Sequence, residues 1–320
     1  MKIKTVIAAA SVSGLAIAGL ASIAPAEAQL TTSCVGTAGK VTVPGDLVVP
    51  KGKSCNLDGT TVEGKVRVQS GADLVAANAT FNDTVSVAAD GFFDAFQTKV
   101  ASNVSASGSY GVYLDESTLG GSYVGKAGDV VPFVYVGDST VAKSINTNSG
   151  EVLVESSKVS GAVTATGAKY LDVVDSTLSK TLTVSDNTDG SLVCGSEVDG
   201  AASFTGNKGV QLGTGSNLGV CDDVNVFGSD VTVSNNTGST VVAGNIIRGN
   251  LAGEGNAPAP TGADNRVRGE ATGQFADLKP AAMQRMAAPA DKAAATKAKG
   301  EQRRAAAKEK AVQAGPAQIG

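Results

Sequence analysis

A repeat of nineteen residues between Gly45 and Gly121 is the feature that most constrains how this chain can fold. When this segment is written in lines of nineteen residues, apolar side chains fall into five columns. Apolar columns at a fixed period are typical of solenoids, in which each repeat buries its apolar face against its neighbours. The columns are Leu47, Val66, Val85 and Val104; Val49, Val68, Val87 and Ala106; Cys55, Leu74, Phe93 and Val112; Leu57, Ala76, Ala95 and Leu114; and Val62, Phe81, Val100 and Leu119.

The length of the repeat indicates the kind of solenoid. A strand–helix–strand unit needs more than about thirty residues, so nineteen residues suit three short strands joined by tight turns. Valine and threonine favour strands, whereas the abundant glycine and asparagine favour turns. The sequence therefore predicts an all-β fold, a single parallel β-helix of about ten rungs over residues 45–250.

After Gly121 the strict period loosens, and a second marker follows the rungs. The marker is a serine followed by any residue and then an apolar residue, and a small or acidic residue usually precedes it. Its apolar residues are 18 to 22 positions apart, which we interpret as one rung each, with small insertions at the corners. They are Leu119, Val141, Val159, Leu178, Val198 and Leu218.

Polar residues in the second half are interpreted as structural. Asn148, Asn187, Asn207 and Asn236 recur about one turn apart or a little more, which predicts a ladder of stacked asparagine side chains. The segment 185–190 has oxygen ligands and a turn glycine, but the glutamate that a calcium loop needs at its twelfth position is absent, so we expect a turn and no metal site. Thr-x-Thr columns, which an ice- or mineral-facing surface would need, are not seen in register.

The two ends of the chain differ from the repeats. Residues 1–28 have the pattern of a secretory signal peptide, with two early lysines, an apolar stretch and an Ala-Glu-Ala cleavage site. Residues 29–44 are expected to cap the first turn, and residues 251–275 to cap the last. Residues 276–320 are rich in alanine, lysine and arginine and lack an apolar stripe, so they are expected to form a disordered or transiently helical basic tail.

Charge is unevenly distributed between these parts. Residues 29–275 carry 15 basic and 25 acidic side chains, a net charge near −10, whereas the tail from residue 276 onward has a net charge near +5. The acidic body lacks the basic face that nucleic-acid binding needs. The predicted mature chain has no other span long enough to cross a bilayer, so we expect a secreted, extracellular or cell-surface protein without a transmembrane segment.

Four cysteines are present, and an even count in an exported protein indicates disulfides. Residues one turn apart in a β-helix lie about 4.8 Å above each other, within reach of a disulfide. Cys34 and Cys55 are 21 residues apart, and Cys194 and Cys221 are 27 apart, so each pair spans about one turn. The sequence therefore predicts the disulfides Cys34–Cys55 and Cys194–Cys221.

Candidate catalytic residues are few. Secreted β-helices often cleave polysaccharides, and such hydrolases need paired carboxylates. The best local pair is Asp222 and Asp223, which follow Cys221 in the longest insertion of the second half. Neighbouring residues on a strand point to opposite faces, so these carboxylates converge only on a bulge or a loop. A solvated acidic loop is the preferred interpretation.

Nine of the thirteen aromatic residues lie between Phe81 and Tyr135. Several of them fall outside the apolar columns, and rings on a solenoid face can stack on sugars or on another protein. Packing under a loop or at a corner is the alternative. The candidate ligand-binding residues are Phe92, Phe96, Tyr110, Tyr113 and Tyr123.

One segment resembles a known family. Asn-Leu-Ala at 250–252, Gly-Asn-Ala-Pro-Ala-Pro-Thr at 255–261, Asn-Arg-Val-Arg-Gly at 265–269 and Gly-Gln at 273–274 are similar to a C-terminal signature of exported actinobacterial β-repeat proteins of uncharacterised function. In that signature a cysteine follows Asn-Leu-Ala and another follows Gly-Gln, whereas this chain has Gly253 and Phe275 there. The resemblance implies export and a surface setting, but no reaction.

Two functions remain open at this point. The favoured hypothesis is a secreted, non-catalytic surface or structural protein that presents a β-helix face for adhesion or assembly, with cell-wall polymer, polysaccharide or another surface protein as partner. The basic tail could also attract anionic polymers. The alternative is a polysaccharide-active hydrolase or lyase that uses its acidic residues. We expect no cofactor and no metal site, although a lyase would need a Ca²⁺-binding aspartate cluster with an arginine or lysine base.

Overall fold

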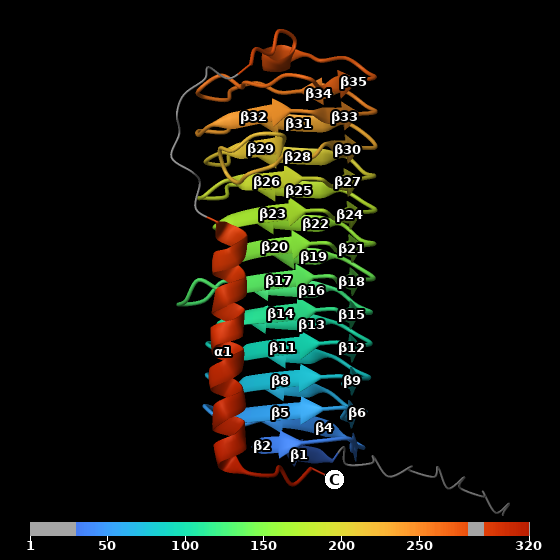
Figure 1. The fold of residues 1–320 in the computed structure, drawn as a ribbon, viewed down its shortest axis with the longest axis vertical. Helices are drawn as coiled ribbons and strands as arrows, with labels where there is room; N and C mark the ends of the chain where they lie inside the picture. Colours follow the sequence, from blue (N-terminus) through green and yellow to red (C-terminus); the bar gives the residue numbers. More distant parts are fainter. Residues whose placement is uncertain (1–29, 281–290, 320) are drawn as a thin grey trace, which may run out of the picture.

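The computed structural model describes residues 30–280 and 291–319. The first of these segments coils into one rod of three parallel sheets (Figure 1). Each turn of the coil contributes one strand to each sheet, so neighbouring strands in a sheet are three elements apart in the chain. Two sheets have twelve strands and one has eleven, which confirms the predicted parallel β-helix but gives about twelve turns in place of about ten. The predicted signal peptide, residues 1–28, and residues 281–290 of the predicted tail lie outside the described residues.

The strands are two to five residues long, and we name the three sheets A, B and C in chain order. Sheet A contains β1 (Thr31–Ser33), β4 (Asp46–Val49), β7 (Val66–Val68), β10 (Val85–Val87), β13 (Val104–Ser107), β16 (Tyr123–Lys126), β19 (Ile145–Thr147), β22 (Val163–Thr166), β25 (Leu182–Ser185), β28 (Ala202–Thr205), β31 (Val231–Ser234) and β34 (Leu251–Ala252). Sheet B contains β2 (Gly36–Ala38), β5 (Ser54–Asp58), β8 (Asp73–Ala77), β11 (Phe92–Phe96), β14 (Gly111–Asp115), β17 (Phe133–Gly137), β20 (Glu151–Glu155), β23 (Tyr170–Val174), β26 (Ser191–Cys194), β29 (Val210–Gly213) and β32 (Thr240–Ala243). Sheet C contains β3 (Thr42–Val43), β6 (Thr61–Val62), β9 (Thr80–Phe81), β12 (Lys99–Val100), β15 (Thr118–Leu119), β18 (Thr140–Val141), β21 (Lys158–Val159), β24 (Thr177–Leu178), β27 (Glu197–Val198), β30 (Asn225–Phe227), β33 (Asn245–Ile247) and β35 (Arg266–Val267).

The five predicted apolar columns form the interior of the coil. In sheet A, Val85 pairs with Val66 on one side and with Val104 on the other. In sheet B, Phe93 lies between Leu74 and Val112 in the same way. All of these side chains are buried in one continuous core, which confirms the register of the nineteen-residue repeat.

The serine of the second marker forms a buried ladder at the corner between sheets B and C. The backbone N–H of Ser117 donates to Oγ of Ser139, and the N–H of Ser139 donates to Oγ of Ser157, both at 2.9 Å. The residue before the serine has a positive φ, as at Glu116 and Asp138 (both 47°), which favours small or acidic residues there. The marker is therefore a corner signal, as predicted.

One rung of that marker was assigned wrongly. Leu218 does not continue the apolar column, because residues 214–224 form a loop that leaves the coil. The column continues at Phe227, which pairs with Val198. The ladder continues at Asn225, whose Oδ1 accepts a hydrogen bond of 3.0 Å from the N–H of Ser196. Asparagine performs here the same bonding as serine, so a search for serine alone missed the rung.

The asparagine ladder is confirmed in part, at the corner between sheets A and B. The N–H of Asn187 donates to Oδ1 of Asn207 at 3.0 Å, and the N–H of Asn207 donates to Oδ1 of Asn236 at 2.8 Å. The ladder extends to Asn256. Asn148 is not a member, because it is exposed and its Oδ1 accepts from the N–H of Ala127.

Both predicted disulfides are present. Cys34 and Cys55 have a Cα–Cα distance of 5.6 Å, and Cys194 and Cys221 have a Cα–Cα distance of 5.7 Å. Both distances match the stacking of neighbouring turns on which the prediction rested. Cys34–Cys55 links neighbouring turns, as expected, whereas Cys194–Cys221 ties β26 to the loop at residues 214–224, which lies outside the coil.

The first turn is closed differently from the expectation. Residues 31–43 form β1, β2 and β3, the first turn of the coil itself, so they are not a separate cap. The end of the chain closes this turn: the N–H of Thr37 donates to the carbonyl of Gly315 at 2.9 Å, and the N–H of Ala317 donates back to the carbonyl of Thr37 at 2.8 Å. Ile319 is buried beneath it. The exposed edge of β2 is thereby covered.

The last turn is completed by β34, β35 and the short 3-10 helix η1 (Gly273–Phe275). The Phe275 side chain is buried in the continuous core. A Cβ atom on Gly253 would lie 1.8 Å from the carbonyl oxygen of Val233 and 2.9 Å from the Phe275 ring, so only glycine fits there. At the two positions where the similar signature has cysteines, this chain packs a ring against a glycine.

The largest departure from the sequence expectation is the tail. Residues 292–314 form one helix, α1 (Lys292–Ala314), which runs along the outer face of sheet B from β23 back towards β2 (Figure 1). A helix of 23 residues is about 34 Å long, and eight neighbouring strands span about the same distance. The described part of the predicted disordered tail is therefore ordered and docked.

Candidate functional site

The outer face of sheet B is the surface that α1 covers. Side chains alternate along a strand, so each five-residue strand points its first, third and fifth residues outward. The strand register aligns these residues in three outward columns. From β8 to β23 they are Asp73, Phe92, Gly111, Phe133, Glu151 and Tyr170; Val75, Asp94, Tyr113, Tyr135, Leu153 and Asp172; and Ala77, Phe96, Asp115, Gly137, Glu155 and Val174.

Four carboxylates of this face are almost fully buried. Asp73, Asp94, Glu151 and Asp172 are each 3% exposed or less. A buried carboxylate is costly unless it is paired, and here α1 supplies the partners. Its cations reach the face in the pairs Arg303–Asp73 (2.6 Å), Lys292–Asp172 (2.9 Å), Arg304–Asp94, Lys299–Glu151 and Lys297–Glu155.

Four of these cations also lie over a tyrosine ring. The guanidinium carbon of Arg304 is 4.6 Å from the centre of the Tyr113 ring, and that of Arg303 is 4.8 Å from the Tyr110 ring. Nζ of Lys292 is 4.6 Å from the Tyr170 ring, and Nζ of Lys297 is 5.6 Å from the Tyr135 ring. Carboxylate and ring both attract a cation. We call these four sites the carboxylate–tyrosine pairs: Asp73–Tyr110, Asp94–Tyr113, Glu155–Tyr135 and Asp172–Tyr170.

The helix brings no large apolar side chain to this face. Its buried residues are Thr296, Gly300, Ala307 and Ala311, and its one larger apolar residue, Val312, is 66% exposed. A Cβ atom on Gly300 would lie 2.2 Å from the Tyr113 ring, so a glycine is needed where helix and ring meet. Thr296 shares a short hydrogen bond with the Tyr170 hydroxyl.

The cations that hold α1 remain partly in water. The side chains of Lys297 and Lys299 are 35% and 43% exposed, and those of Arg303 and Arg304 about one fifth exposed. Salt screens ion pairs whose cations reach the solvent, although less than it screens fully exposed pairs. We therefore expect ionic strength to loosen the contact between α1 and sheet B.

Asp94 is the most perturbed carboxyl of the face. Burial raises its pKa from an ordinary 3.8 to about 6, although the nearby Arg304 and Lys308 lower it, and Asp115 raises it further. Its Oδ1 atom has no hydrogen-bond partner among the described residues, and neither has Nη2 of Arg304. Burial also raises the pKa of Asp172. The docked helix thus makes both carboxyls harder to ionise.

This shift predicts a pH dependence of docking. When α1 lifts off, Asp94 meets water and its pKa returns towards 3.8, so docking takes up a proton between about pH 6 and pH 4. Docking is therefore expected to strengthen as the pH falls through 6, by up to about tenfold per pH unit. Hydrogen exchange of the α1 amides, compared at matched intrinsic exchange rates, measures this.

The control for this prediction is Asp94→Asn, which keeps the shape but cannot ionise. The variant should show a flatter dependence between pH 6 and pH 4.5, because proton uptake is then left to Asp172 and Asp115, whose pKa values burial also raises. Equal pH dependence in the two proteins would contradict the assignment to Asp94. The salt bridges of Glu151 lower its pKa, so protonation of Glu151 affects the docking of α1 at a lower pH than protonation of Asp94 does.

The aromatic candidates divide into two groups. Phe92 and Tyr113 lie on the outer face of sheet B and are buried, Tyr110 is half-buried beside them, and Phe96 is half-buried at the edge of the face. Tyr123 was placed wrongly among them: it pairs with Val104 in sheet A and is 2% exposed within the core. Its ring occupies the interior column of Val104, nineteen residues further on, so the strict period still holds at Tyr123 although the predicted columns end at Gly121.

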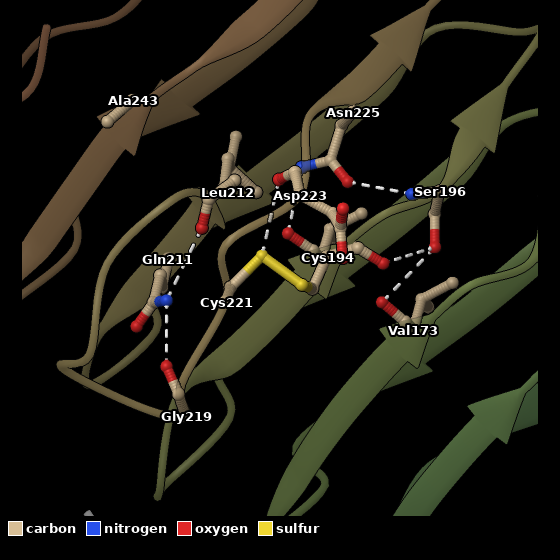
Figure 2. The surroundings of a disulfide bond; sticks show 12 residues. Val173, Cys194, Ser196, Gln211, Leu212, Gly219, Cys221, Asp223, Asn225 and Ala243 are labelled. Atoms are coloured by element: carbon tan, nitrogen blue, oxygen red, sulfur yellow. Dashed lines mark hydrogen bonds between the residues drawn. A yellow bond between two sulfur atoms is a disulfide. The ribbon is translucent and has the colours of Figure 1, made fainter.

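A disulfide-bonded loop covers the next part of sheet B (Figure 2). The side chain of Gln211 holds this loop: its Oε1 accepts from the N–H groups of Asn217 (2.9 Å) and Leu218 (2.8 Å), and its Nε2 donates to the carbonyl of Gly219 (3.0 Å). Cys221 then ties the loop to β26 through Cys194. Leu218 to Val220 line a cavity together with the first residues of α1.

The catalytic candidates Asp222 and Asp223 directly follow this loop. Both are exposed, and Figure 2 shows Asp223 beside the disulfide. Among the described residues, neither carboxylate forms a hydrogen bond or an ion pair, and a Cβ atom on Gly195 would lie 3.4 Å from the Cβ atom of Asp223. The arrangement is the solvated acidic loop that the sequence favoured.

The outer face of sheet A carries rows of hydroxyl groups. The strand register aligns Thr164 with Thr183 and then Ser203, and aligns Thr166 with Ser185. Of the four strands β22, β25, β28 and β31, only β22 has Thr-x-Thr, so the rows are mixed threonine and serine, and corner insertions hide their alignment in the sequence. The two rows are Thr164, Thr183, Ser203 and Thr232; and Thr166, Ser185, Thr205 and Ser234.

The functional residues that sequence reasoning missed are the carboxylates of sheet B and the cations of α1. One signal was available: acidic residues at outward positions of the repeat, such as Asp73 and Asp94, lie between the aromatic ones. A second was Gly300, an interruption in an otherwise strongly helix-forming segment. Neither signal shows which segment of the chain the residues contact.

Metal sites and membrane-spanning helices can be assessed for the described residues. In residues 30–280 and 291–319, no group of three or more His, Cys, Asp or Glu side chains is arranged to hold a metal ion. The segment 185–190 is a turn, in which Asn187 is used by the asparagine ladder. No helix in the described part of the chain is long and apolar enough to span a bilayer.

Comparisons with family models, curated proteins and solved structures found no match.

Proposed function

We propose that this chain is an exported, non-catalytic surface protein whose β-helix adheres to a polysaccharide or cell-wall polymer through the outer face of sheet A. The observation that carries the proposal is the pair of hydroxyl rows, in register over β22, β25, β28 and β31. These rows repeat about every 4.8 Å along the rod, and the two hydroxyls on each strand are about 6.6 Å apart. A regular polymer can meet such a regular array of donors and acceptors at many points.

The setting of the protein is inferred from several independent features. Two disulfides suit an oxidising compartment outside the cytoplasm. The signal-like residues 1–28 and the similarity of residues 250–274 to an exported family point in the same direction. The continuous core and the closed first turn supply the rigidity that a repetitive contact surface needs.

The enzymatic alternative has less support. A glycosidase needs two carboxyl groups at a defined separation with a sugar-binding cleft between them. Asp222 and Asp223 are exposed neighbours on the chain, next to a loop that Gln211 and a disulfide hold against sheet B. The alternative is therefore kept only as an outcome of the test.

The test is co-sedimentation of the purified protein with insoluble polysaccharides, combined with an assay for released sugars. We expect binding without turnover, and at least tenfold weaker binding for Thr183→Lys with Ser203→Lys, which places two lysines in the hydroxyl rows. The matched control is Thr140→Lys with Thr177→Lys, at outward positions of sheet C. Sugar release that Asp223→Asn abolishes would replace the proposal with the enzymatic alternative, and equal binding by both double variants would refute sheet A as the contact face.

A further inference from the structure

We infer that the outer face of sheet B is a recognition site for lysine- and arginine-rich helices of a partner protein, and that α1 is its built-in occupant. The face is therefore autoinhibited in the chain described here. The ligand class is a cationic helix whose basic residues are spaced by alanine and other small residues. This site is separate from the hydroxyl rows of sheet A.

The first argument is the repeated design of the site. Each of the four carboxylate–tyrosine pairs receives a basic side chain that touches both a carboxylate oxygen and the face of a ring, and Asp73 also receives Lys310 at 3.5 Å. Four cases along one helix indicate a surface that selects cations in a defined order.

The second argument is the steric fit between helix and sheet. The rings of Phe92, Tyr113, Phe133 and Tyr135, together with Leu153, form an apolar cluster on the outer face, separate from the core of the coil. Only small residues fit above this cluster, as the close approach of Gly300 to Tyr113 shows. Selection therefore combines charge with a small-residue stripe, and it rejects helices that carry bulky apolar residues at these positions.

The third argument is that α1 is suited to exchange. Nine of its 23 residues are alanine, and lysine, arginine, glutamine and glutamate make up most of the rest, so the segment favours the helical state before it docks. It buries no leucine, isoleucine or aromatic side chain against sheet B, and its cations remain partly solvated. The cap formed by Gly315 to Ile319 is a separate contact with β2 and the core. Release of the helix thus leaves the end of the rod covered.

The probe for this site is a synthetic peptide with the sequence of residues 291–314, which keeps the N-cap Asp291. The receiving protein is the full chain with Gly300→Leu, Arg303→Glu and Arg304→Glu, in which the helix in cis no longer fits but sheet B is intact. Circular dichroism and intact disulfides verify its fold. Binding is measured by fluorescence anisotropy at 50 mM and 300 mM NaCl.

The expected result is binding to this variant, at least tenfold weaker binding to the unmodified chain, and at least tenfold loss of affinity at the higher salt concentration. The control receiver adds Asp73→Lys and Asp94→Lys, which should abolish binding. The control peptide carries glutamate in place of both arginines and should not bind. If the triple variant does not fold, Gly300→Leu alone serves as the receiver.

Two outcomes would overturn the inference. One is a folded receiver that does not bind the peptide. The other is equal binding by the unmodified chain or by the control receiver, which would mean that the peptide attaches to the acidic body at large. Polysaccharide binding by sheet A is measured separately, so failure of either proposal leaves the other intact.

Discussion

Replacing Gly300 with leucine should detach α1 from sheet B while leaving the β-helix folded. The new side chain would collide with the Tyr113 ring, because even a Cβ atom at this position lies 2.2 Å from it. Overpacking of this kind costs about 1 to 3 kcal/mol. Hydrogen-exchange protection of the α1 amides should therefore fall by up to about 100-fold, and trypsin should cleave α1 at its lysines and arginines much faster.

The expected loss of protection is opposite to the change in helix propensity. Leucine favours a helix by close to 1 kcal/mol over glycine, so the isolated segment becomes a better helix as it docks less well. The control is Ala298→Leu, at an exposed position of α1. That substitution should change protection little, whereas undiminished protection in Gly300→Leu would contradict the observed packing of α1 on Tyr113.

Replacing Asn236 with leucine should destabilise the coil itself by about 3 to 5 kcal/mol, since several buried groups lose their partners at once. Oδ1 of Asn236 accepts from the N–H and from Nδ2 of Asn207, and its Nδ2 donates to the carbonyl of Phe204 and to Oδ1 of Asn256. Leucine has a similar volume but makes none of these bonds. Thermal and urea unfolding followed by circular dichroism measures the loss.

Asn148→Leu is the matched control for this prediction. Asn148 recurs at a similar spacing in the sequence, but its side chain is exposed and lies outside the ladder. A surface substitution of this kind should cost less than about 1 kcal/mol. If the two variants were equally stable, the ladder would contribute no more than an ordinary surface hydrogen bond.

The rungs could be predicted from the sequence because each one repeats the same short-range pattern. Val66, Val85 and Val104 are successive members of one column, and each lies directly on its predecessor. The Cys34–Cys55 disulfide followed from the same stacking, whereas Cys221 reaches Cys194 from the loop at residues 214–224. The prediction was wrong at Leu218, which lies in a loop outside the coil that has the same Ser-x-apolar sequence as the corners.

The helix on sheet B could not be predicted in the same way. Its partners are far away along the chain: Lys292 binds Asp172, 120 residues before it, and Arg303 binds Asp73, 230 residues before it. No repeat relates these residues. The search for an apolar stripe also missed the helix, because α1 docks through cations and small residues.

The nineteen-residue period by itself determined that this chain is a parallel β-helix and which side chains form its interior. These properties depend on contacts between neighbouring turns, and the period encodes such contacts directly. Only the tertiary structure decided that the basic tail becomes a helix on sheet B and that Ile319 closes the first turn. Those contacts join segments with no shared pattern, so their complementarity in charge and shape exists only once the coil has brought the outward columns together.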